Sequence, residues 1–395
     1  MSELILTLNA GSSSLKFAAF ARQGAALAAL ASGAIDGLGA AATFHAKSAD
    51  AGTQAYAFDE RCGRVDHAVA LGAIIEWLDA SHYDHDVVAV GHRIVHGGPD
   101  YSTPLRIDEA VLAKLRALIP LAPLHQPHNI AGVEAAIAAF PGIPEVACFD
   151  TAFHRSHPFV ADTFALPRSY YDDGVRRYGF HGLSYEFVAR RLREVAPAAA
   201  AGSAIVGHLG NGASMCAMRQ GRSIASTMGF TALDGLPMGT RCGQLDPGVV
   251  LYLMAEKGMD AEAITDLLYK NSGLKGMSGL SQDVRVLEAS DSQGARDALA
   301  YFVARVRREI GGLAAALEGV DAIVFTGGIG ENAWRVREAV LTGMGWLGVR
   351  LDPQANRASA EIISAAGSPT TVFVLKTDEE RMIAEHTSQT VGASS

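Results

Sequence analysis

The feature that most constrains the fold is a strand–turn–strand unit that occurs twice, about half a chain apart. The first unit spans residues 4–20 around the turn Asn9-Ala-Gly-Ser-Ser-Ser-Leu-Lys16, and the second spans residues 204–218 around Gly210-Asn-Gly-Ala-Ser214. Two apolar runs joined by Gly and Ser residues predict a β-hairpin. The two units do not align well outside their turns, but the recurrence of the pattern indicates a duplicated domain.

Segments with strand character alternate with segments of helical periodicity along the rest of the chain. Further strands are expected at residues 87–90, 145–149 and 322–325, and helices at 68–78, 109–118, 185–194, 295–317 and 334–342. This alternation is typical of α/β architecture, in which ligands bind at the carboxyl ends of strands. The sequence therefore predicts an α/β fold with its polar site residues placed just after strands.

The composition excludes several classes of protein. A chain of 395 residues suggests two or three domains, and 49% of hydrophobic residues excludes a largely disordered state. The formal net charge of −9 disfavours a broad binding surface for nucleic acid or for an anionic membrane. We therefore expect neither nucleic acid nor a membrane as a partner.

The cysteines and the N-terminal residues favour a cytoplasmic location. Cys62, Cys148, Cys216 and Cys242 are widely spaced without a Cys-x-x-Cys pair, which fits neither a disulfide framework nor a zinc site. The first residues lack the basic region that begins a signal peptide. The uncharged stretch 195–218 contains a Pro and several Gly residues, so we expect no membrane span there.

The turn from Asn9 to Lys16 carries the clearest chemical signal. Three consecutive hydroxyls, a Gly and a Lys can surround an oxyanion with backbone N–H groups and a positive charge. The turn is not a Walker A loop, because the sequence lacks that pattern and a strand rather than a helix follows the turn. An ordinary Ser-rich hairpin is the alternative interpretation.

A second signal, Gly327-Gly-Ile-Gly-Glu-Asn332, matches a relaxed dinucleotide-binding fingerprint between a strand and a helix. Two observations argue against a nicotinamide cofactor. Too few residues follow the motif for the required βαβαβ half, and the charge of Glu331 inside the loop would repel a pyrophosphate. We expect this loop to hold the sugar and base of a nucleotide instead.

Charged side chains near these segments are candidates for anion or metal binding. Arg241 stands between small residues in Met-Gly-Thr-Arg-Cys-Gly, which favours contact with an anion. Asp150 and Glu379 follow a strand or open a helix, where a carboxylate can hold a metal or simply cap a helix. His125 and His181 each follow an apolar residue, and a histidine in that setting is commonly structural.

Taken in order from Asn9 to Glu379, nine motifs resemble the acetate/propionate kinase family. They are Leu-Asn-Ala-Gly-Ser-Ser-Ser-Leu-Lys, Gly-His-Arg-Ile-Val-His-Gly-Gly, Pro-Leu-His-Gln-Pro, Phe-Asp-Thr-Ala-Phe-His, Tyr-Gly-Phe-His-Gly, His-Leu-Gly-Asn-Gly, Met-Gly-Thr-Arg-Cys-Gly, Thr-Gly-Gly-Ile-Gly-Glu-Asn and Thr-Asp-Glu-Glu. The resemblance implies two duplicated actin-like ATPase (ribonuclease H-like) domains that flank an active-site cleft, in a cytoplasmic homodimer. It implies an N-terminal domain of residues 1–150, a nucleotide-binding and dimerisation domain of residues 151–381, and a C-terminal helix, 382–395, that packs back onto the first domain.

The resemblance also implies roles for individual residues. Mg²⁺, with Mn²⁺ as a substitute, would lie at Asn9 and Glu379. The catalytic positions would be Arg93, which binds the substrate carboxylate, Asp150 as the catalytic acid, and His125, His181 and Arg241. The acyl pocket would be formed by Arg93, Val95, Leu124, Phe180 and Ala232, the last of which is Pro in some members. ATP or ADP would be bound by Lys16, Ser12, Ser14, His208, Leu209, Gly210, Asn211, Gly212, Asp283, Val284, Arg285, Gly327, Gly328, Ile329, Gly330 and Glu331.

We therefore expect reversible, in-line phosphoryl transfer between ATP and acetate, which gives acetyl phosphate and ADP. Such a transfer needs positioning and charge neutralisation, which Mg²⁺, Arg93, Arg241 and His181 would supply. Because acetate is already ionised at pH 7, we expect Asp150 to organise hydrated Mg²⁺ or to orient an Arg rather than to accept a proton.

Three alternatives stay open at this point. A propionate kinase of the same family would keep the chemistry and change the acyl pocket. A nucleotide-gated sensor would keep the fold without catalysis, and a dehydrogenase depends on the Gly327 motif alone. If residues 88–95 form a strand and its extension, Arg93 and Val95 face the same side, and a stiff Val there favours acetate over propionate.

Overall fold

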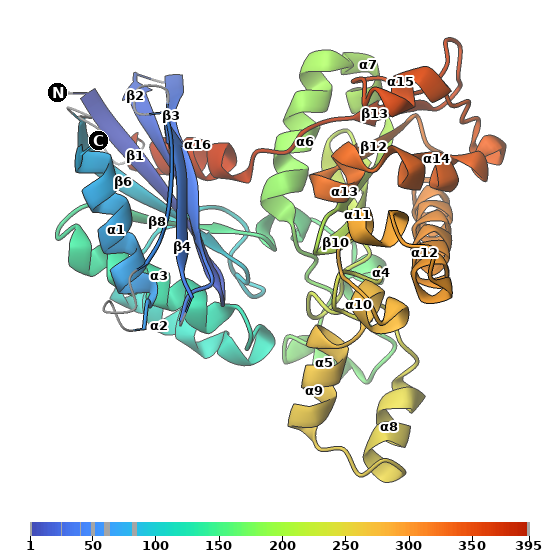
Figure 1. Cartoon of the computed structure of the whole chain (residues 1–395), viewed down its shortest axis with the longest axis horizontal. Helices are drawn as coiled ribbons and strands as arrows, with labels where there is room; N and C mark the ends of the chain where they lie inside the picture. The colour runs from blue at the N-terminus through green and yellow to red at the C-terminus, as the bar shows by residue number, and fades with distance from the viewer. Residues whose placement is uncertain are drawn as a thin grey trace. The chain divides into compact units, whose positions relative to one another are not determined.

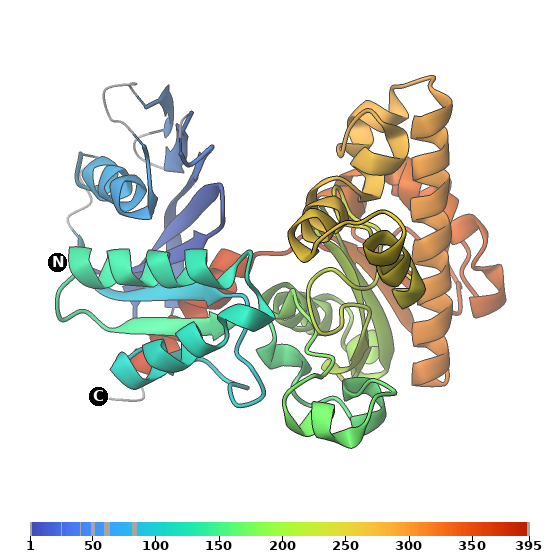
Figure 2. The same ribbon diagram turned by 90° about the horizontal axis from the view of Figure 1, so that it is seen from below.

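The structure, a computed structural model, describes residues 2–24, 26–39, 41–48, 52–58, 64–80 and 85–392. The chain divides into two compact units, each built around its own sheet (Figures 1 and 2). Unit 1 contains Met1–Ala152 and the C-terminal segment Asp378–Ser395, and unit 2 contains Phe153–Thr377. Cys62 and the last three residues of the expected C-terminal helix lie outside the described residues.

The sheet of unit 1 has the strand order β5-β4-β3-β2-β1-β6-β8-β7. Its strands are β1 (Ser2–Ala10), β2 (Ser14–Gln23), β3 (Ala26–Asp36), β4 (Thr43–Ser48), β5 (Gly52–Ala57), β6 (His85–Ile94), β7 (Leu105–Arg106) and β8 (Glu145–Phe149). Strands β1 to β5 pair antiparallel, whereas β1, β6 and β8 run parallel to one another. The parallel strands carry their carboxyl ends to one edge of the sheet.

The sheet of unit 2 has the order β11-β10-β9-β12-β13. Its strands are β9 (Ser203–Leu209), β10 (Ala213–Arg219), β11 (Arg222–Ser226), β12 (Ala322–Thr326) and β13 (Thr371–Val374). Here β9 to β11 pair antiparallel and β9, β12 and β13 are parallel, which repeats the pattern of β3-β2-β1-β6-β8. The two hairpins predicted from the sequence are confirmed as β1–β2 and β9–β10, and they occupy equivalent places in the two sheets.

Helices cover both faces of the sheet in unit 1. On one face are α1 (His67–Ala80), α2 (Glu109–Ala117), the 3-10 turn η2 (Ile119–Leu121) and α3 (Gln126–Ala139), and on the other is α16 (Glu379–Gly392). Because strand side chains alternate between faces, Leu4, Leu6 and Leu8 of β1 pack toward α1, whereas Ile5 packs toward Ala384 of α16. The apolar run of β1 is therefore continuous because both faces of the strand are buried.

Unit 2 has the same layered arrangement. The helix α6 (Gly182–Val195) packs Tyr185, Val188 and Leu192 against the sheet, and the long α12 (Gln293–Leu317) contacts β10. The other elements are η3 (Ala152–His154), α4 (Phe159–Asp162), α5 (Arg168–Asp172), α7 (Pro197–Ala201), α8 (Pro247–Ala255), α9 (Ala261–Lys270), α10 (Gly273–Ser278), α11 (Val284–Glu288), α13 (Gly327–Asn332), α14 (Trp334–Thr342), η4 (Gly345–Leu347) and α15 (Pro353–Arg357).

The structure differs from the sequence-based expectation at two segments. The Gly-rich segment 327–332 is the short helix α13 rather than a loop, because the carboxylate of Glu331 accepts a hydrogen bond from the Gly327 N–H and closes the turn. The C-terminal helix begins at Glu379, three residues before its expected start at 382. Both differences bring Glu331 and Glu379 into regular structure, where their positions are fixed.

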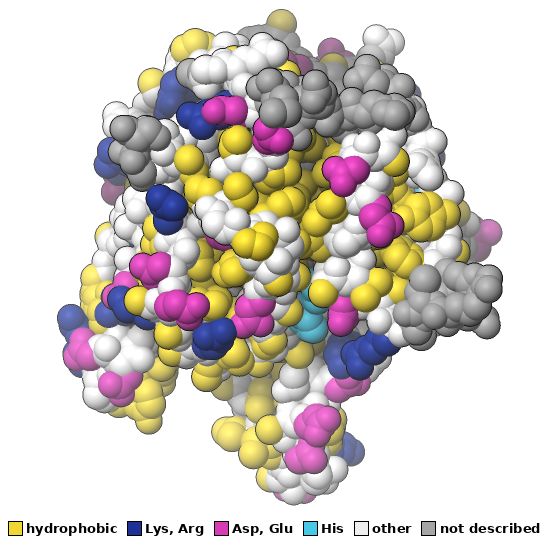
Figure 3. Space-filling model, turned by 90° about the vertical axis from the view of Figure 1, so that its left-hand side faces the viewer, with side chains coloured by type: hydrophobic (Ala, Val, Ile, Leu, Met, Phe, Trp, Pro, Cys, Tyr) yellow, Lys and Arg dark blue, Asp and Glu magenta, His cyan; other side chains and the backbone are white. Residues whose placement is uncertain are grey.

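The surface of the molecule carries charged side chains of both signs (Figure 3). On the face drawn in Figure 3, acidic and basic side chains are interspersed around an area of apolar side chains. Within the described ranges, no helix is both long enough and apolar enough to cross a membrane.

The close contact of α16 with β6 generates a prediction about stability. A Cβ at Gly91 would overlap Thr387 Oγ1 and would lie 2.7 Å from Ile383 Cγ2. Gly91→Ala should therefore displace α16 and destabilise the protein by about 1–3 kcal/mol, measured by denaturant unfolding. Gly72→Ala, in α1, is the control, because a Cβ there meets no atom of the described residues within 4 Å. Equal unfolding midpoints for the two variants would contradict this packing.

Candidate active site

Strand alternation places the polar candidates of unit 1 on one face of the sheet. Gly91 of β6 faces α16, so Arg93, two residues later, faces the same side. Asn9 pairs with Lys16 across β1 and β2, on the face that carries Ile5 and Ala18 toward α16. Asp150 follows β8 directly, and Glu379 is the first residue of α16. The sheet edge and the start of one helix thus bring these side chains together.

An ion pair between Arg93 and Asp150 forms the centre of this cluster. Arg93 Nε donates to Asp150 Oδ1 at 3.0 Å, and Nη2 donates to Oδ2 at 2.6 Å. The Asp150 backbone N–H donates to Ile94 O at 3.0 Å, which fixes the carboxylate next to β6. Asp150 is almost fully buried, so this bidentate, charge-assisted pair holds the guanidinium in one orientation.

The remaining contacts of Arg93 leave donors on the outer side of the guanidinium. Nη1 donates to Asn9 Oδ1 at 3.2 Å, and Glu379 Oε2 lies 3.9 Å from Nε. Burial acts to lower the pKa of Arg93, but the carboxylates of Asp150 and Glu379 outweigh it and the pKa is raised. Arginine has five N–H groups, and the hydrogen bonds within the described residues leave one N–H on each terminal nitrogen for an anion.

The side-chain oxygen atoms around Arg93 are of the kind that binds a hard divalent cation. Asn9, Asp150 and Glu379 offer amide and carboxylate oxygens, the ligands that Mg²⁺ prefers when a phosphate completes its shell. Burial, followed by the charge of Glu379, raises the pKa of Glu380, the residue next to Glu379. Among the described residues, no group of three His, Cys, Asp or Glu side chains forms a complete protein-only metal site.

Two further residues of unit 1, Val95 and Asn129, connect the end of β6 to α3. Val95 is buried just after β6, and its N–H donates to Asn129 Oδ1 at 2.9 Å. Asn129 Nδ2 in turn donates to Ala10 O at 2.6 Å, which ties α3 to both β1 and β6. Sequence reasoning missed Asn129, and its only signal was a polar residue among the apolar positions of a helix. Leu124 and His125 stand immediately before α3.

Backbone hydrogen bonds close the β1–β2 turn and tie it to the segment after β3. The Gly11 N–H donates to Ser14 O at 2.8 Å, and the Leu38 N–H donates to Ser13 O at 3.0 Å. The ring of His67 hydrogen-bonds Gly11 O at 3.0 Å. Ser12 lies in the turn and Ser14 begins β2, so both hydroxyls stand at the same end of the sheet as Lys16.

In unit 2, His181 occupies a constrained backbone position. It is the N-cap of α6 with φ of 58°, in the left-handed region that a non-glycine residue rarely adopts. Its Nδ1 hydrogen-bonds Ser214 Oγ at 2.8 Å, and Ser214 Oγ lies 2.5 Å from Tyr185 Oη. The His181 ring stacks on that of His208, with 4.2 Å between centroids. These contacts fix the His181 imidazole beside the β9–β10 turn.

Two glycine-containing segments, around Gly239 and Gly327, contact that turn. A Cβ at Gly212 would lie 3.2 Å from His181 Nε2 and 3.9 Å from Arg241 Nη1. A Cβ at Gly327, where φ is +77°, would lie 2.8 Å from Leu209 O, so only glycine fits. The Gly239 N–H donates to the backbone carbonyl of Asn211 at 3.0 Å. The sequence-predicted nucleotide residues of 208–212 and 327–331 therefore lie side by side.

The remaining predicted residues of unit 2 have distinct surroundings. Arg241 Nη1 donates to Ala232 O at 3.0 Å, so the guanidinium and the predicted acyl-pocket position are in contact. Phe180 is buried directly before His181. Asp283 caps α11 through the Arg285 N–H, and the Arg285 side chain, 88% exposed, lowers the pKa of Asp283 through a hydrogen bond.

The structure argues against the dinucleotide-binding interpretation. Glu331 Oε1 accepts from the N–H groups of Gly327, at 3.0 Å, and of Thr377, at 3.3 Å. A pyrophosphate would need the Gly327 N–H that Glu331 already occupies. The sheet order, with an antiparallel hairpin beside parallel strands, also differs from the doubly wound order of a dinucleotide-binding fold.

Comparison with known proteins identifies the family. Residues 4–385 match the model of the acetokinase family. An acetate kinase of Methylocella silvestris is 60% identical over 98% of this chain and 98% of its own length. An acetate kinase of Nitrobacter hamburgensis is 53% identical over 97% of this chain and 95% of its own length. The chain therefore belongs to the acetokinase family.

Solved structures confirm the predicted α/β fold class. The chain resembles the acetate kinase of Porphyromonas gingivalis with a TM-score of 0.88 at 37% identity, over 99% of this chain and 100% of that one. It resembles a propionate kinase of Francisella tularensis with a TM-score of 0.91 at 34% identity, over 98% of this chain and 100% of that one. Likeness to both proteins leaves acyl-chain preference to be argued from the pocket residues.

The ion pair predicts the effect of removing one charge. In Asp150→Asn an amide NH₂ would face an Arg93 N–H, so the guanidinium loses its fixed orientation. We expect turnover to fall by about 10²-fold, the cost of a reacting group displaced by about 1 Å, and the Mg²⁺ requirement to rise. Steady-state assays over a range of Mg²⁺ concentrations measure both effects, with Asp79→Asn, an exposed acid of α1, as the control. Unchanged Mg²⁺ dependence together with loss of an acidic limb in the pH profile would indicate a general base instead.

Proposed function

We propose that the protein catalyses the reversible transfer of the γ-phosphoryl group of ATP to acetate, giving acetyl phosphate and ADP. The observation that carries the proposal is the fixed guanidinium of Arg93, with one donor on each terminal nitrogen, next to a set of oxygen donors suited to a cation. Two parallel N–H groups match the two oxygens of a carboxylate. The family and the named relatives favour acetate as that carboxylate.

The proposal assigns each predicted residue a task. In unit 1, Arg93 binds the acetate carboxylate, and Asp150 orients Arg93. Asn9 and Glu379, with Asp150 nearby, would hold Mg²⁺, which supplies positive charge to the phosphate oxygens of ATP. The hydroxyls of Ser12 and Ser14 and the ammonium of Lys16 bind phosphate oxygens.

In unit 2, the proposal assigns ATP to the segments that surround the β9–β10 turn. Residues 208–212, 283–285 and 327–331 hold the nucleotide, and Gly327 and Gly212 allow the segments around the turn to pack closely. His181 and Arg241 donate hydrogen bonds to the phosphoryl group as it moves between oxygens. A loose transition state carries its charge on the equatorial oxygens, so these donors act most strongly at that point.

Asp150 serves as a positioning group rather than as a base in this scheme. Both of its oxygens already accept hydrogen bonds from Arg93. Acetate needs no deprotonation at neutral pH. His125, directly before α3, is retained as a further catalytic candidate.

A hydroxamate assay for acyl phosphate tests the proposed function directly. Purified protein is incubated with ATP, Mg²⁺ and formate, acetate, propionate or butyrate in the presence of hydroxylamine. The proposal predicts acyl hydroxamate with acetate as the best substrate and propionate as a measurable second. Failure to form hydroxamate with all four acids would refute it, and propionate as the best substrate would establish the alternative of a propionate kinase.

Val95 generates a prediction about chain length. The residue is buried two positions after Arg93, on the same side of the β6 extension, so it lies toward the methyl end of a carboxylate held by Arg93. A pocket of this kind separates substrates that differ by one methylene by about 10–200-fold. Val95→Ala should lower KM for propionate and narrow the acetate preference in kcat/KM, with KM for ATP unchanged. An unchanged acetate/propionate ratio would remove Val95 from the pocket.

We also propose that the protein is a homodimer and that α8 belongs to the interface. All nine residues of α8 escape burial within the described chain, although they include Val249, Leu251, Tyr252 and Met254. Exposed apolar side chains clustered on one helix mark an interaction surface. A second copy of the chain is the occupant that the family resemblance implies.

The dimer proposal is tested at Leu251, which is 66% exposed. Leu251→Asp would place an unpaired charge in the interface and should weaken the dimer by about 10²-fold or more. Analytical ultracentrifugation of a dilution series measures the change. Val160→Asp, at an 83% exposed apolar residue of α4, is the matched control and should leave the dimer intact. A monomeric wild type, or a Leu251→Asp dimer as tight as the control, would contradict the assignment.

We place the protein in the cytoplasm. Cys148, Cys216 and Cys242 are free thiols, as expected of a protein that works in a reducing compartment.

A further inference from the structure

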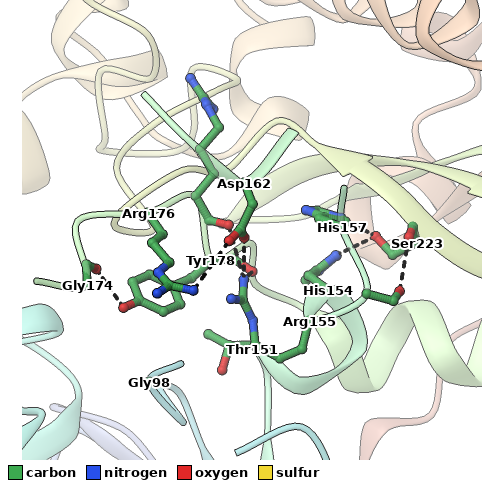
Figure 4. Close-up of polar contacts among 12 residues, drawn as sticks. Gly98, Thr151, His154, Arg155, His157, Asp162, Gly174, Arg176, Tyr178 and Ser223 are labelled. Atoms are coloured by element: carbon green, nitrogen blue, oxygen red, sulfur yellow. Dashed lines mark hydrogen bonds and ion pairs between the residues drawn. The ribbon is translucent and has the colours of Figure 1, made fainter. Parts of the chain in front are cut away.

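Three polar side chains of unit 2 are hydrogen-bonded to one another next to the segment that leads to His181. None of them has a role in the proposed phosphoryl transfer. His154 ends the turn η3, His157 follows it by three residues, and Ser223 lies on β11 (Figure 4). His154 Nδ1 and His157 Nε2 each lie 2.7 Å from Ser223 Oγ. His154 Nε2 lies 3.0 Å from the backbone carbonyl of Phe180, the residue before His181.

We propose that His157, Ser223 and His154 form a directed chain of hydrogen bonds that holds the Phe180 carbonyl and thereby positions the backbone of His181. The inference rests on the catalytic role proposed for His181. His154, Ser223 and His157 are positioning residues in this account, because they act on His181 through the neighbouring backbone and are assigned no contact with substrate.

The carbonyl of Phe180, at which the series of hydrogen bonds ends, fixes the direction of every hydrogen bond in the series. A carbonyl oxygen only accepts, so His154 Nε2 carries the proton and donates it to Phe180 O. In a neutral imidazole the other nitrogen then accepts, so the Ser223 hydroxyl donates to His154 Nδ1. Ser223 has no second proton, so His157 Nε2–H must donate to Ser223 Oγ.

Two other observations agree with this assignment. Burial lowers the pKa of His154 to about 4 and also lowers that of His157, so both rings are neutral at pH 7. The assignment leaves a lone pair on His157 Nδ1, and that buried atom finds no hydrogen-bond donor in the described part of the chain. The Cys216 thiol, whose pKa burial raises to about 12, lies 3.2 Å from Ser223 Oγ and stays protonated beside it.

Arg155, the residue after His154, fixes the backbone just before Phe180. Arg155 Nη2 donates to the carbonyls of Arg177, at 3.1 Å, and of Tyr178, at 3.0 Å. The ring of His154 lies so close to Gly179, where φ is +72°, that a Cβ there would lie 2.6 Å from His154 Cδ2. Residues 154–155 thus fix three carbonyls in the segment that leads to His181.

This anchoring matters because His181 has a backbone conformation that it would not keep by itself. The Phe180 carbonyl belongs to the peptide plane that precedes the left-handed φ of 58° at His181. Residues in this region persist only where the surroundings determine them. With the carbonyl fixed by His154 and the ring fixed by Ser214, the imidazole has one orientation.

Ser223→Ala is the first test. It removes the donor to His154 Nδ1 and the acceptor of His157, so we expect kcat for acetate phosphorylation to fall by about 10- to 100-fold, as for a small displacement of a reacting group. KM for ATP should not change, because His181 acts on the transition state. Ser226→Ala is the matched control on the same strand, since Ser226 Oγ is buried and makes no hydrogen bond to any described residue. Equal kcat for the two variants would overturn the proposal.

Conservative variants of His154 separate positioning from packing. In His154→Gln the terminal NH₂ can still donate to Phe180 O, whereas in His154→Asn the shorter side chain reaches only Ser223. The proposal predicts that His154→Gln keeps a higher kcat than His154→Asn at equal thermal stability. The reverse order, or equal kcat values, would overturn it. This comparison also decides the matter if Ser223→Ala does not fold.

Nitrogen-15 NMR of the histidine-labelled wild type gives a readout that does not depend on activity. The proposal predicts a proton on Nε2 and none on Nδ1 for both His154 and His157 at pH 7. A proton on His154 Nδ1 would overturn the proposed chain of hydrogen bonds even in an active enzyme. Conversely, if the protein shows the predicted tautomers but makes no acyl phosphate, the proposed function is refuted and the proposed chain of hydrogen bonds is not.

Discussion

The ion pair between Arg93 and Asp150 is the interaction on which the candidate site of unit 1 depends. An arginine on a strand end can adopt many rotamers, and a substrate carboxylate would have to pay for ordering it. The buried carboxylate of Asp150 removes that freedom in advance, because it takes the Nε side of the guanidinium. The N–H groups that remain are therefore already oriented, as the proposed binding of a substrate carboxylate requires.

The sheets explain how distant segments supply this constellation. Parallel strands β1, β6 and β8 end at one edge, and alternation sends Asn9, Arg93 and the residue after β8 to the face that α16 covers. The equivalent edge of unit 2 gathers the β9–β10 turn and the start of α13. One topology, used twice, thus gathers the cluster around Arg93 in unit 1 and a set of glycine-rich segments in unit 2.

Much of this arrangement could be predicted from the sequence, because it depends on local pattern. The alternating strands and helices and the two hairpin turns are visible as apolar runs and Gly/Ser turns. The helical form of residues 327–332 is harder to predict from the sequence, because it depends on a hydrogen bond to Glu331 that a strand–loop–helix pattern does not reveal. Asn129 and Ser223 are not predictable in this way, because each acts through a long-range contact with residues that no local pattern connects to it.

A kinetic comparison of Arg93→Lys with the wild type tests the central claim most directly. Lysine keeps the charge but cannot satisfy Asp150 and a substrate carboxylate with one planar fork. The account predicts that KM for acetate rises by about 10- to 100-fold, the worth of a charge-assisted hydrogen bond, while KM for ATP stays at the wild-type value. An unchanged KM for acetate, or a loss that appears in KM for ATP instead, would contradict the assignment of the carboxylate to Arg93.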